Sequence, residues 1–256
     1  MSSPIRVLVP VDDTDSEALA IPLAYAKTIA QRANSRAEKI VLLTHTKQQL
    51  RSTSLVSHLG VQACKALAAN KPVGLGEGLV LHHETLQTLR FGVGRAIVIA
   101  FYADEKMMDF VDGLSGLIGV IAVPWLKGGA GAWAARWTPH VHGEAAQHPA
   151  KILDDPVIES ALKQLSLVTN LSHSALHPRD KQYADETLRI LRTKGHSAPV
   201  ASIKSWAIRE GWKPGAAEDL ARLAEKIFAL KTKPSLSKFH DADGRYARWK
   251  AGSEEA

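Results

Sequence analysis

Five consecutive side chains that carry oxygen atoms follow directly on the apolar run IRVLVPV: Asp12, Asp13, Thr14, Asp15 and Ser16. Carboxylates gathered between the end of a strand and the start of a helix can hold Mg²⁺ and place a phosphate on the helix amides. The same residues can also simply start a helix, because Thr14 and Glu17 have the spacing of a capping box. Capping needs fewer assumptions, but the sequence leaves a nucleotide or magnesium site open.

Two adjacent histidines, His82 and His83, end a predicted strand and are the second candidate. A histidine there can face the same cleft as Asp12 if both strands end at the same edge of a sheet. Side chains alternate between the two faces of a strand, so at most one of the pair can line a site. We take His82 as the candidate ligand-binding residue, with simple packing of both histidines as the alternative.

The segment 127–154 holds a third group of residues that could do chemistry. His140, His142 and His148 could bind Zn²⁺ or Ni²⁺, with Glu144 as a fourth ligand, although a flexible loop would position them poorly. A further set lies in and just before this segment, and it consists of Trp125, Trp133 and Trp137. These indoles can form a stacking surface or, as we expect, fix the segment onto the neighbouring sheet.

The elements that position these residues follow from hydrophobic periodicity. Short β-branched apolar runs predict strands at 5–11, 39–45, 79–84, 95–102 and 118–125. Ala/Leu-rich segments predict helices at 16–33, 54–69 and 105–114, the first of them containing Pro22. We therefore predict an α/β domain over 1–126, with a mainly parallel five-stranded sheet sandwiched by helices.

Composition changes after this domain. Segment 127–154 is rich in Gly, Ala, His and Pro, and we predict a linker there. Residues 155–256 predict a smaller all-helical domain, with helices at 156–172, 178–195, 199–211 and 214–231 and a tail that is partly ordered through its aromatic residues. Residues 199–231 also have part of a helix-turn-helix pattern, with Ala207 and Gly211 at the expected spacing. Glu218 and Asp219 would repel DNA there, so an αα-hairpin is favoured.

The stretch VLVPVDDTDSEALAIPLAYAKTIA, followed by KIVLLTHT, resembles the opening of universal stress proteins over residues 5–46. Those proteins start with a strand ending in Val-Pro-Val-Asp, a turn rich in Ser, Thr and Asp, and an Ala/Leu helix. The resemblance implies a five-stranded α/β fold, ATP binding, dimerisation, and a place for Asp12 near the adenine or ribose. The glycine-rich ATP motif of that family does not follow the fourth predicted strand, which continues ADEKMMDFVDGL.

Charge and composition restrict the class of protein. The net charge of +6 is spread over both halves of the chain, so it permits nucleic-acid binding without favouring it. Cys64 is the single cysteine, which excludes an internal disulfide. The longest apolar stretches are about half the roughly 20 residues that cross a bilayer, so we expect no membrane association. A cytoplasmic bacterial protein is the expectation.

No complete catalytic motif accompanies these candidate sites, so whether the protein is an enzyme stays open. We predict a non-catalytic regulatory or adaptor protein whose α/β domain binds ATP, another nucleotide or a protein partner, and whose helical domain mediates assembly, including homodimerisation. One alternative is an Mg²⁺-dependent enzyme of phosphate chemistry that uses Asp12, Asp13 and Asp15. The other is a DNA-binding protein that uses 199–231.

Overall fold

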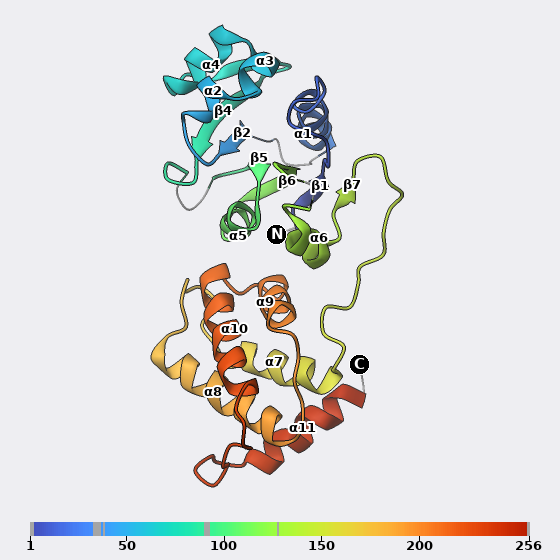
Figure 1. Ribbon diagram of the computed structural model, residues 1–256, viewed down its shortest axis with the longest axis vertical. Coiled ribbons are helices and arrows are strands. Elements are labelled where there is room, and N and C mark those ends of the chain that lie inside the picture. Colours follow the sequence, from blue (N-terminus) through green and yellow to red (C-terminus); the bar gives the residue numbers. More distant parts are fainter. Residues whose placement is uncertain (1–2, 33–36, 38, 90–92, 127, 255–256) are drawn as a thin grey trace. The chain divides into compact units, whose positions relative to one another are not determined.

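The chain of the computed structural model folds into two compact units, Met1–Pro149 and Ala150–Ala256, shown in Figure 1. We call them the α/β unit and the helical unit. The structure describes residues 3–32, 37, 39–89, 93–126 and 128–254. None of the described helices combines the length and the apolar character that a bilayer span requires.

The α/β unit is built on one sheet, in which the described residues form seven strands. In chain order they are β1 (Ile5–Leu8), β2 (Lys39–Thr44), β3 (Val73–Gly76), β4 (Leu79–Thr85), β5 (Ala96–Ala103), β6 (Leu117–Pro124) and β7 (His140–Val141). Their spatial order is β3-β4-β2-β5-β6-β1-β7, and every pair is parallel except β3 with β4. The α/β class and the mainly parallel sheet are confirmed, whereas the count of five strands was too low.

The two additional strands are short and lie at the two edges of the sheet. β3 forms an antiparallel hairpin with β4, and the turn residues Glu77 and Gly78 both have positive φ, as a two-residue hairpin turn requires. β7 pairs only two residues, His140 and Val141, with β1. A strand of two residues is too short to show a period of two, and a glycine-rich hairpin is easily taken for a loop.

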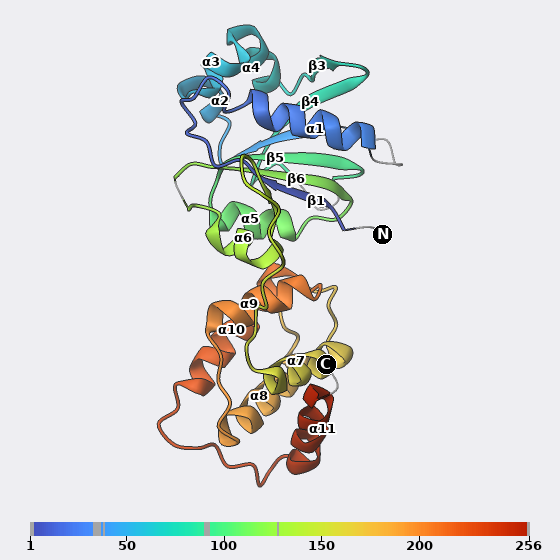
Figure 2. The same cartoon turned by 90° about the vertical axis from the view of Figure 1, so that its right-hand side faces the viewer.

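Helices cover both faces of the sheet, which makes three layers (Figure 2). One face carries α1 (Ala20–Arg32), α2 (Gln49–Ser52), α3 (Leu55–Leu59) and α4 (Val61–Ala68), and the other carries α5 (Glu105–Asp112) and α6 (Gly131–Trp137). Neighbouring strand residues alternate between the two cores: Leu42 packs under the first group and Leu43 under the second. The strands are therefore apolar on both faces, as a covered parallel sheet requires.

The first helix begins later than predicted. Residues 13–19 form successive turns, and the regular helix α1 starts at Ala20 rather than at residue 16. Pro22 has no N–H to donate to the carbonyl of Ala18, which delays the regular hydrogen-bond pattern. The capping box predicted from Thr14 and Glu17 is therefore not the start of this helix.

Segment 127–154 was predicted as a linker, but its first part belongs to the α/β unit. It contains α6 and β7, and α6 packs on α5 through a buried carboxylate, Asp112. Asp112 accepts hydrogen bonds from the indole nitrogens of Trp133 (3.2 Å) and Trp137 (3.0 Å), and Arg136 forms an ion pair with it at 2.6 Å. These contacts order a glycine- and alanine-rich sequence that has little regular pattern of its own.

The helical unit contains α7 (Pro156–Val168), α8 (Pro178–Thr193), α9 (Val200–Arg209), α10 (Pro214–Phe228) and α11 (Ala242–Glu254). The first four are the predicted helices, each ending two to four residues early. Proline occupies the first turn of α7, α8 and α10, and Asp155 caps α7 by accepting from the N–H groups of Val157 and Ile158. The tail contributes α11, which packs on α7 and buries Trp249.

Candidate functional site

The order of the strands points to one position on the carboxyl edge of the sheet. From β2 the chain proceeds to β4 on one side, and from β5 it proceeds to β6 on the other. The direction of winding thus reverses between β2 and β5, which lie side by side. In open α/β sheets, ligands bind outside the carboxyl ends of the strands at such a switch point.

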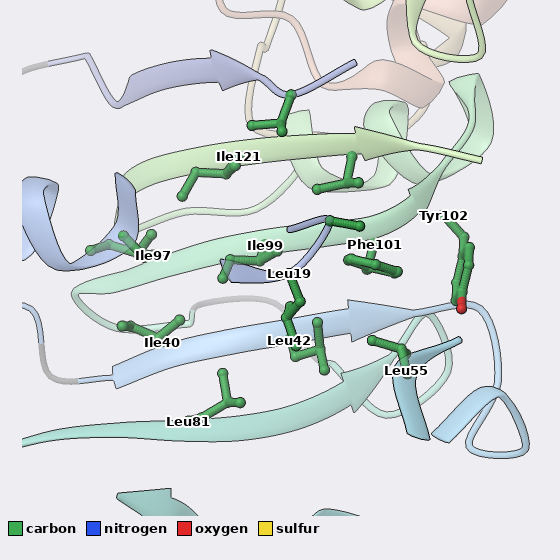
Figure 3. Packing of buried hydrophobic residues seen from close by; sticks show 14 of the residues in the cluster. Leu19, Ile40, Leu42, Leu55, Leu81, Ile97, Ile99, Phe101, Tyr102 and Ile121 are labelled. Carbon is green, nitrogen blue, oxygen red and sulfur yellow. The ribbon is translucent and has the colours of Figure 1, made fainter. Parts of the chain in front are cut away.

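A β-bulge at the end of β5 directs a tyrosine toward this position. The register between β5 and β6 shifts between Phe101 and Ala103, and Tyr102 between them has φ +67°. As a result Phe101 and Tyr102 both pack in the core beneath α1–α4, although successive strand residues normally alternate. Figure 3 shows Tyr102 at the end of β5, beyond Phe101. Bulges and positive φ at a bulky residue are frequent next to binding sites.

A pocket of about 400 Å³ lies at this edge. Its lining comes from four parallel strands and the segments that follow them: Asp13 and Thr14 after β1, Gln49, Thr53, Ser54, Ser57 and His58 after β2, Tyr102 from β5, and Trp125 after β6. The side chains of the lining supply five hydroxyl groups, one carboxylate, one amide, one imidazole and two aromatic ring systems. This volume is within the range of small-molecule sites.

Hydrogen bonds join four of these residues into a chain. Ser54 Oγ donates to Asp13 Oδ2 at 2.7 Å and lies 2.9 Å from the Tyr102 hydroxyl. Because Ser54 donates its one hydroxyl proton to the carboxylate, Tyr102 is the donor in the second bond. The Nε2–H of His58 donates to the backbone carbonyl of Asp13 at 2.7 Å. Asp13 is thereby held in place by residues 41 and 45 positions further along the chain.

The structure separates the five oxygen-bearing residues predicted as a site. Asp13 and Thr14 line the pocket, whereas Asp12, Asp15 and Ser16 are exposed and are not part of its lining. Asp12 Oδ1 accepts from the N–H and hydroxyl of Thr14, and these bonds lower the pKa of Asp12. Asp15 accepts from the N–H of Glu17. Of the two neighbouring aspartates, Asp13 and not Asp12 lines this pocket.

Neither histidine of β4 lines the pocket. His83 is buried and its Nε2 hydrogen bonds to Thr44 Oγ1 at 2.8 Å. His82 pairs in register with Val41, whose side chain packs on the α5 side, while His83 pairs with Leu42 on the opposite side. The two side chains do point to opposite faces, but His82 is not brought to Asp13.

The sequence did not reveal six of the lining residues, of which Ser54, His58 and Tyr102 belong to the hydrogen-bonded chain. Ser54 and His58 lie in a predicted helix, where their types carry no motif. Tyr102 was the last residue of a predicted strand, and a bulge is not visible in a single sequence. Only their position in the sequence could have indicated them, because each lies at or after the carboxyl end of a parallel strand.

The three tryptophans have different roles. Trp133 is fully buried in the core and Trp137 packs beside it, which agrees with a role in fixing this segment. The side chain of Trp125 is 59% exposed at the pocket and contacts the Tyr102 ring edge-on at 5.8 Å between centroids. The Trp125 ring is therefore partly accessible beside the hydroxyl groups of the pocket.

The three aspartates do not converge on a common point. Throughout the part of the chain that the structure describes, no group of three or more His, Cys, Asp or Glu side chains could hold a metal ion. This arrangement gives no support to the Mg²⁺-dependent alternative.

The helix-turn-helix alternative rests on α9 and α10, which pack on each other. Gly211 has φ +90° in the turn between them, and Trp206, Ala207 and Leu220 are buried. Glu218 pairs with Lys204 at 3.1 Å and with Arg222 at 3.0 Å, and Asp219 accepts from the N–H of Leu176. These acidic groups are thus engaged in contacts within the helical unit, and α9 and α10 pack as an αα-hairpin.

Comparison with known proteins identifies one similarity, in the helical unit. Residues 154–250 match a family profile described as Domain of unknown function (DUF1889). The match runs from just before α7 into α11. No curated protein and no solved structure matches the chain.

Proposed function

We propose that this is a regulatory or adaptor protein whose α/β unit binds a nucleoside-type ligand in the pocket at the carboxyl edge of the sheet, and whose helical unit mediates assembly. The observation that carries the proposal is the chain of Asp13, Ser54 and Tyr102 beside the accessible ring of Trp125. It supports a ligand that has hydroxyl groups at one end and a flat ring at the other.

Asp13 is suited to bind the hydroxyl groups of a sugar. Its Oδ2 is held by Ser54, and no described residue hydrogen bonds to its Oδ1. A carboxylate oxygen accepts from hydroxyl donors, and charge-assisted bonds of this kind are about twice as strong as neutral ones. A ribose has two adjacent hydroxyl groups, and both can donate hydrogen bonds to one carboxylate.

The charge of the lining favours the nucleoside part over the phosphates. None of the described lining residues is Lys or Arg, and Asp13 would repel a phosphate placed beside it. The pocket also has the indole of Trp125, on which a base can stack with about 1–3 kcal/mol. We therefore place the base and sugar in the pocket, with any phosphate directed into solvent.

The helical unit carries the assembly role in this proposal. Leu167 and Val168 at the end of α7 are 86% and 59% exposed, and such large apolar side chains side by side are typical of contact surfaces. Val168 also borders a pocket of about 340 Å³ between α7, α8 and α11. A protein partner or a second copy of the chain would cover this region.

Calorimetric titration and thermal shift with adenosine, guanosine, cytidine and uridine, each compared with its monophosphate and triphosphate with and without Mg²⁺, test the proposal. A ligand that binds only the folded protein raises its melting temperature. We expect one of the nucleosides to bind and its phosphates to add no affinity. Asp13→Asn should weaken binding at least about ten-fold, because it replaces a charged acceptor by a neutral one.

Asp12→Asn is the matched control, since it makes the same change one residue away at an exposed position outside the pocket. Equal losses in Asp12→Asn and Asp13→Asn would contradict the proposed site. Binding of ATP that requires Mg²⁺ and exceeds that of adenosine would favour the phosphate-chemistry alternative. Absence of binding by every nucleoside and nucleotide would remove the proposal for the α/β unit.

A further inference from the structure

His140 lies on the strand β7, and His142 directly follows this strand and is still hydrogen bonded to β1. β7 lies parallel to β1, with His140 opposite Val7, and the N–H of His142 donates to the carbonyl of Leu8 at 2.8 Å. Residues two apart on a strand project from the same face. The His-x-His spacing therefore directs both imidazoles to one side of the sheet.

Tyr25 of α1 meets the two imidazoles on that side. Its hydroxyl oxygen lies 3.0 Å from His140 Nε2 and 3.1 Å from His142 Nδ1. Both rings contact the tyrosine ring edge-on, with centroids 5.7 and 5.8 Å apart. Tyr25 and His142 are half-buried and His140 is exposed, so the cluster is supported by the fold and open to solvent.

We propose that Tyr25, His140 and His142 form a binding site for a divalent transition-metal ion, of which Zn²⁺, Ni²⁺ and Cu²⁺ are the class that imidazole ligands suit. Two imidazole nitrogens and a phenol oxygen supply three ligand atoms, and water completes the coordination. In a tetrahedral zinc site with bonds of about 2.0–2.1 Å, neighbouring ligand atoms are about 3.3 Å apart. The distances from the phenol oxygen to the two imidazole nitrogens, 3.0 and 3.1 Å, need to increase by only a few tenths of an ångström.

Binding exchanges protons for the ion. In the metal-free cluster the phenol donates its proton to one imidazole nitrogen and accepts an N–H from the other. When the metal ion binds, the phenol proton leaves to solvent, the oxygen coordinates as phenolate, and the donating imidazole changes to the tautomer whose lone pair faces the ion. One divalent ion thus enters and one proton leaves, with no change of oxidation state.

The ion would fasten an edge of the sheet. β7 is short, with two residues paired to β1, whereas α1 packs on the sheet through a buried face. An ion shared between β7 and α1 links the last strand of the α/β unit to its first helix. The site is separate from the pocket at Asp13 and does not depend on the proposed nucleoside binding.

Metal titrations of untagged, chelator-treated full-length protein test this site. We expect one Zn²⁺ per chain by calorimetry and one Cu²⁺ per chain with a phenolate-to-copper absorption band in the visible range. His140→Ala and His142→Ala should each lower the affinity at least about ten-fold, the size of effect seen even for groups that only support a ligand. Tyr25→Phe keeps the ring but should abolish the absorption band and weaken binding.

His148→Ala and His173→Ala are the matched controls, because they remove imidazoles outside the cluster and should leave binding unchanged. Circular dichroism of each variant shows whether it is folded, and any unfolded alanine variant is replaced by His140→Phe or His142→Phe. Failure of the wild type to bind one equivalent would overturn the proposal. Unchanged affinity in the His140 variant, or an absorption band that persists in Tyr25→Phe, would do the same.

Discussion

His83 is a buried histidine that the fold holds in its neutral form. Its side chain is 5% exposed, and its Nε2 is bonded to Thr44 Oγ1, which itself donates to the carbonyl of Thr46. Nε2 must therefore be the donor, and Nδ1 is buried with no partner among the described residues. Burial, followed by the nearby charge of Lys47, lowers the pKa of His83 from 6.5 to about 4.

This pKa predicts a specific dependence of stability on pH. Between pH 6.5 and 4, His83 is protonated in the unfolded chain but stays neutral in the folded protein. The contribution of His83 to the free energy of unfolding is therefore fully present above pH 6.5 and is lost as the pH falls toward 4. The contribution lost between pH 7.5 and pH 5 is about 2 kcal/mol. In urea unfolding at several pH values, His83→Gln should have a flatter profile than the wild type.

The exposed His148 offers the control, since His148→Gln should retain the wild-type profile. The slope with pH is the quantity compared, because the buried substitution also changes stability at every pH. Parallel profiles of the wild type and His83→Gln would show that His83 is not the group responsible.

Asp112 is the second residue whose substitution we expect to change the free energy of unfolding strongly. Among the described residues, Asp112→Ala leaves Arg136, which is 2% exposed, with Asp109 at 3.3 Å as its remaining carboxylate partner. Removing one partner of a buried ion pair costs about 3–5 kcal/mol. We expect Asp112→Ala to lower the free energy of unfolding by that amount in urea titrations, and Asp15→Ala, on the surface, by less than about 1 kcal/mol. Similar effects of the two substitutions would contradict the buried network.

At the scale of elements, one glycine interrupts the helix that is predicted between residues 54 and 69. The sequence predicts a single helix there, but α3 ends and α4 begins at Gly60, whose φ is +80° and ψ 154°. This region of backbone conformation is essentially restricted to glycine. With this break, Ser54 at the N-cap of α3 and Ser57 within α3 line the pocket while Leu67 of α4 packs on the sheet.

The change in stability caused by Gly60→Ala has opposite signs for one continuous helix and for two helices that meet at Gly60. In a continuous helix Gly60→Ala would stabilise the protein by about 1 kcal/mol. At the observed φ and ψ it should instead destabilise by about 1–3 kcal/mol, although no atom lies within 4 Å of the added Cβ. Gly131→Ala, in α6 without positive φ and equally free of contacts, should be neutral or mildly stabilising. Increased thermal stability of Gly60→Ala would contradict the break.

At the scale of the molecule, each unit buries its own core. The cores on the two faces of the sheet are formed by apolar residues of the α/β unit. The helical unit buries residues from all five of its described helices, among them Leu162, Leu188, Trp206, Leu220 and Trp249. A domain with its own core can fold by itself.

We therefore expect residues 150–256 to fold when expressed alone, with helical circular dichroism and a cooperative thermal transition. The fragment 178–256 is the control: it lacks α7, which packs on both α8 and α11, and should lose the cooperative transition. A helical unit that is unfolded without the α/β unit would contradict the division into two self-contained cores.

The sequence by itself determined the class of each long element. Five parallel strands and the helices α5, α7, α8, α9 and α10 follow from periodicity, proline positions and apolar runs, which are local properties of the chain. It also placed Asp13 and Thr14 at the carboxyl edge of the sheet. Short elements such as β3, β7 and α6 were not predicted, because two to seven residues show no reliable hydrophobic period.

Only the tertiary structure decided which side chains work together. Asp13 meets Ser54, Ser54 meets Tyr102, and Tyr25 meets His140, across 41 to 115 positions of sequence. Such encounters depend on strand order, on the bulge at Tyr102 and on the edge pairing of β7. These features arise from packing between distant segments, so no local pattern could separate Asp13 from Asp12 or bring two histidines of an apparent loop onto a tyrosine of the first helix.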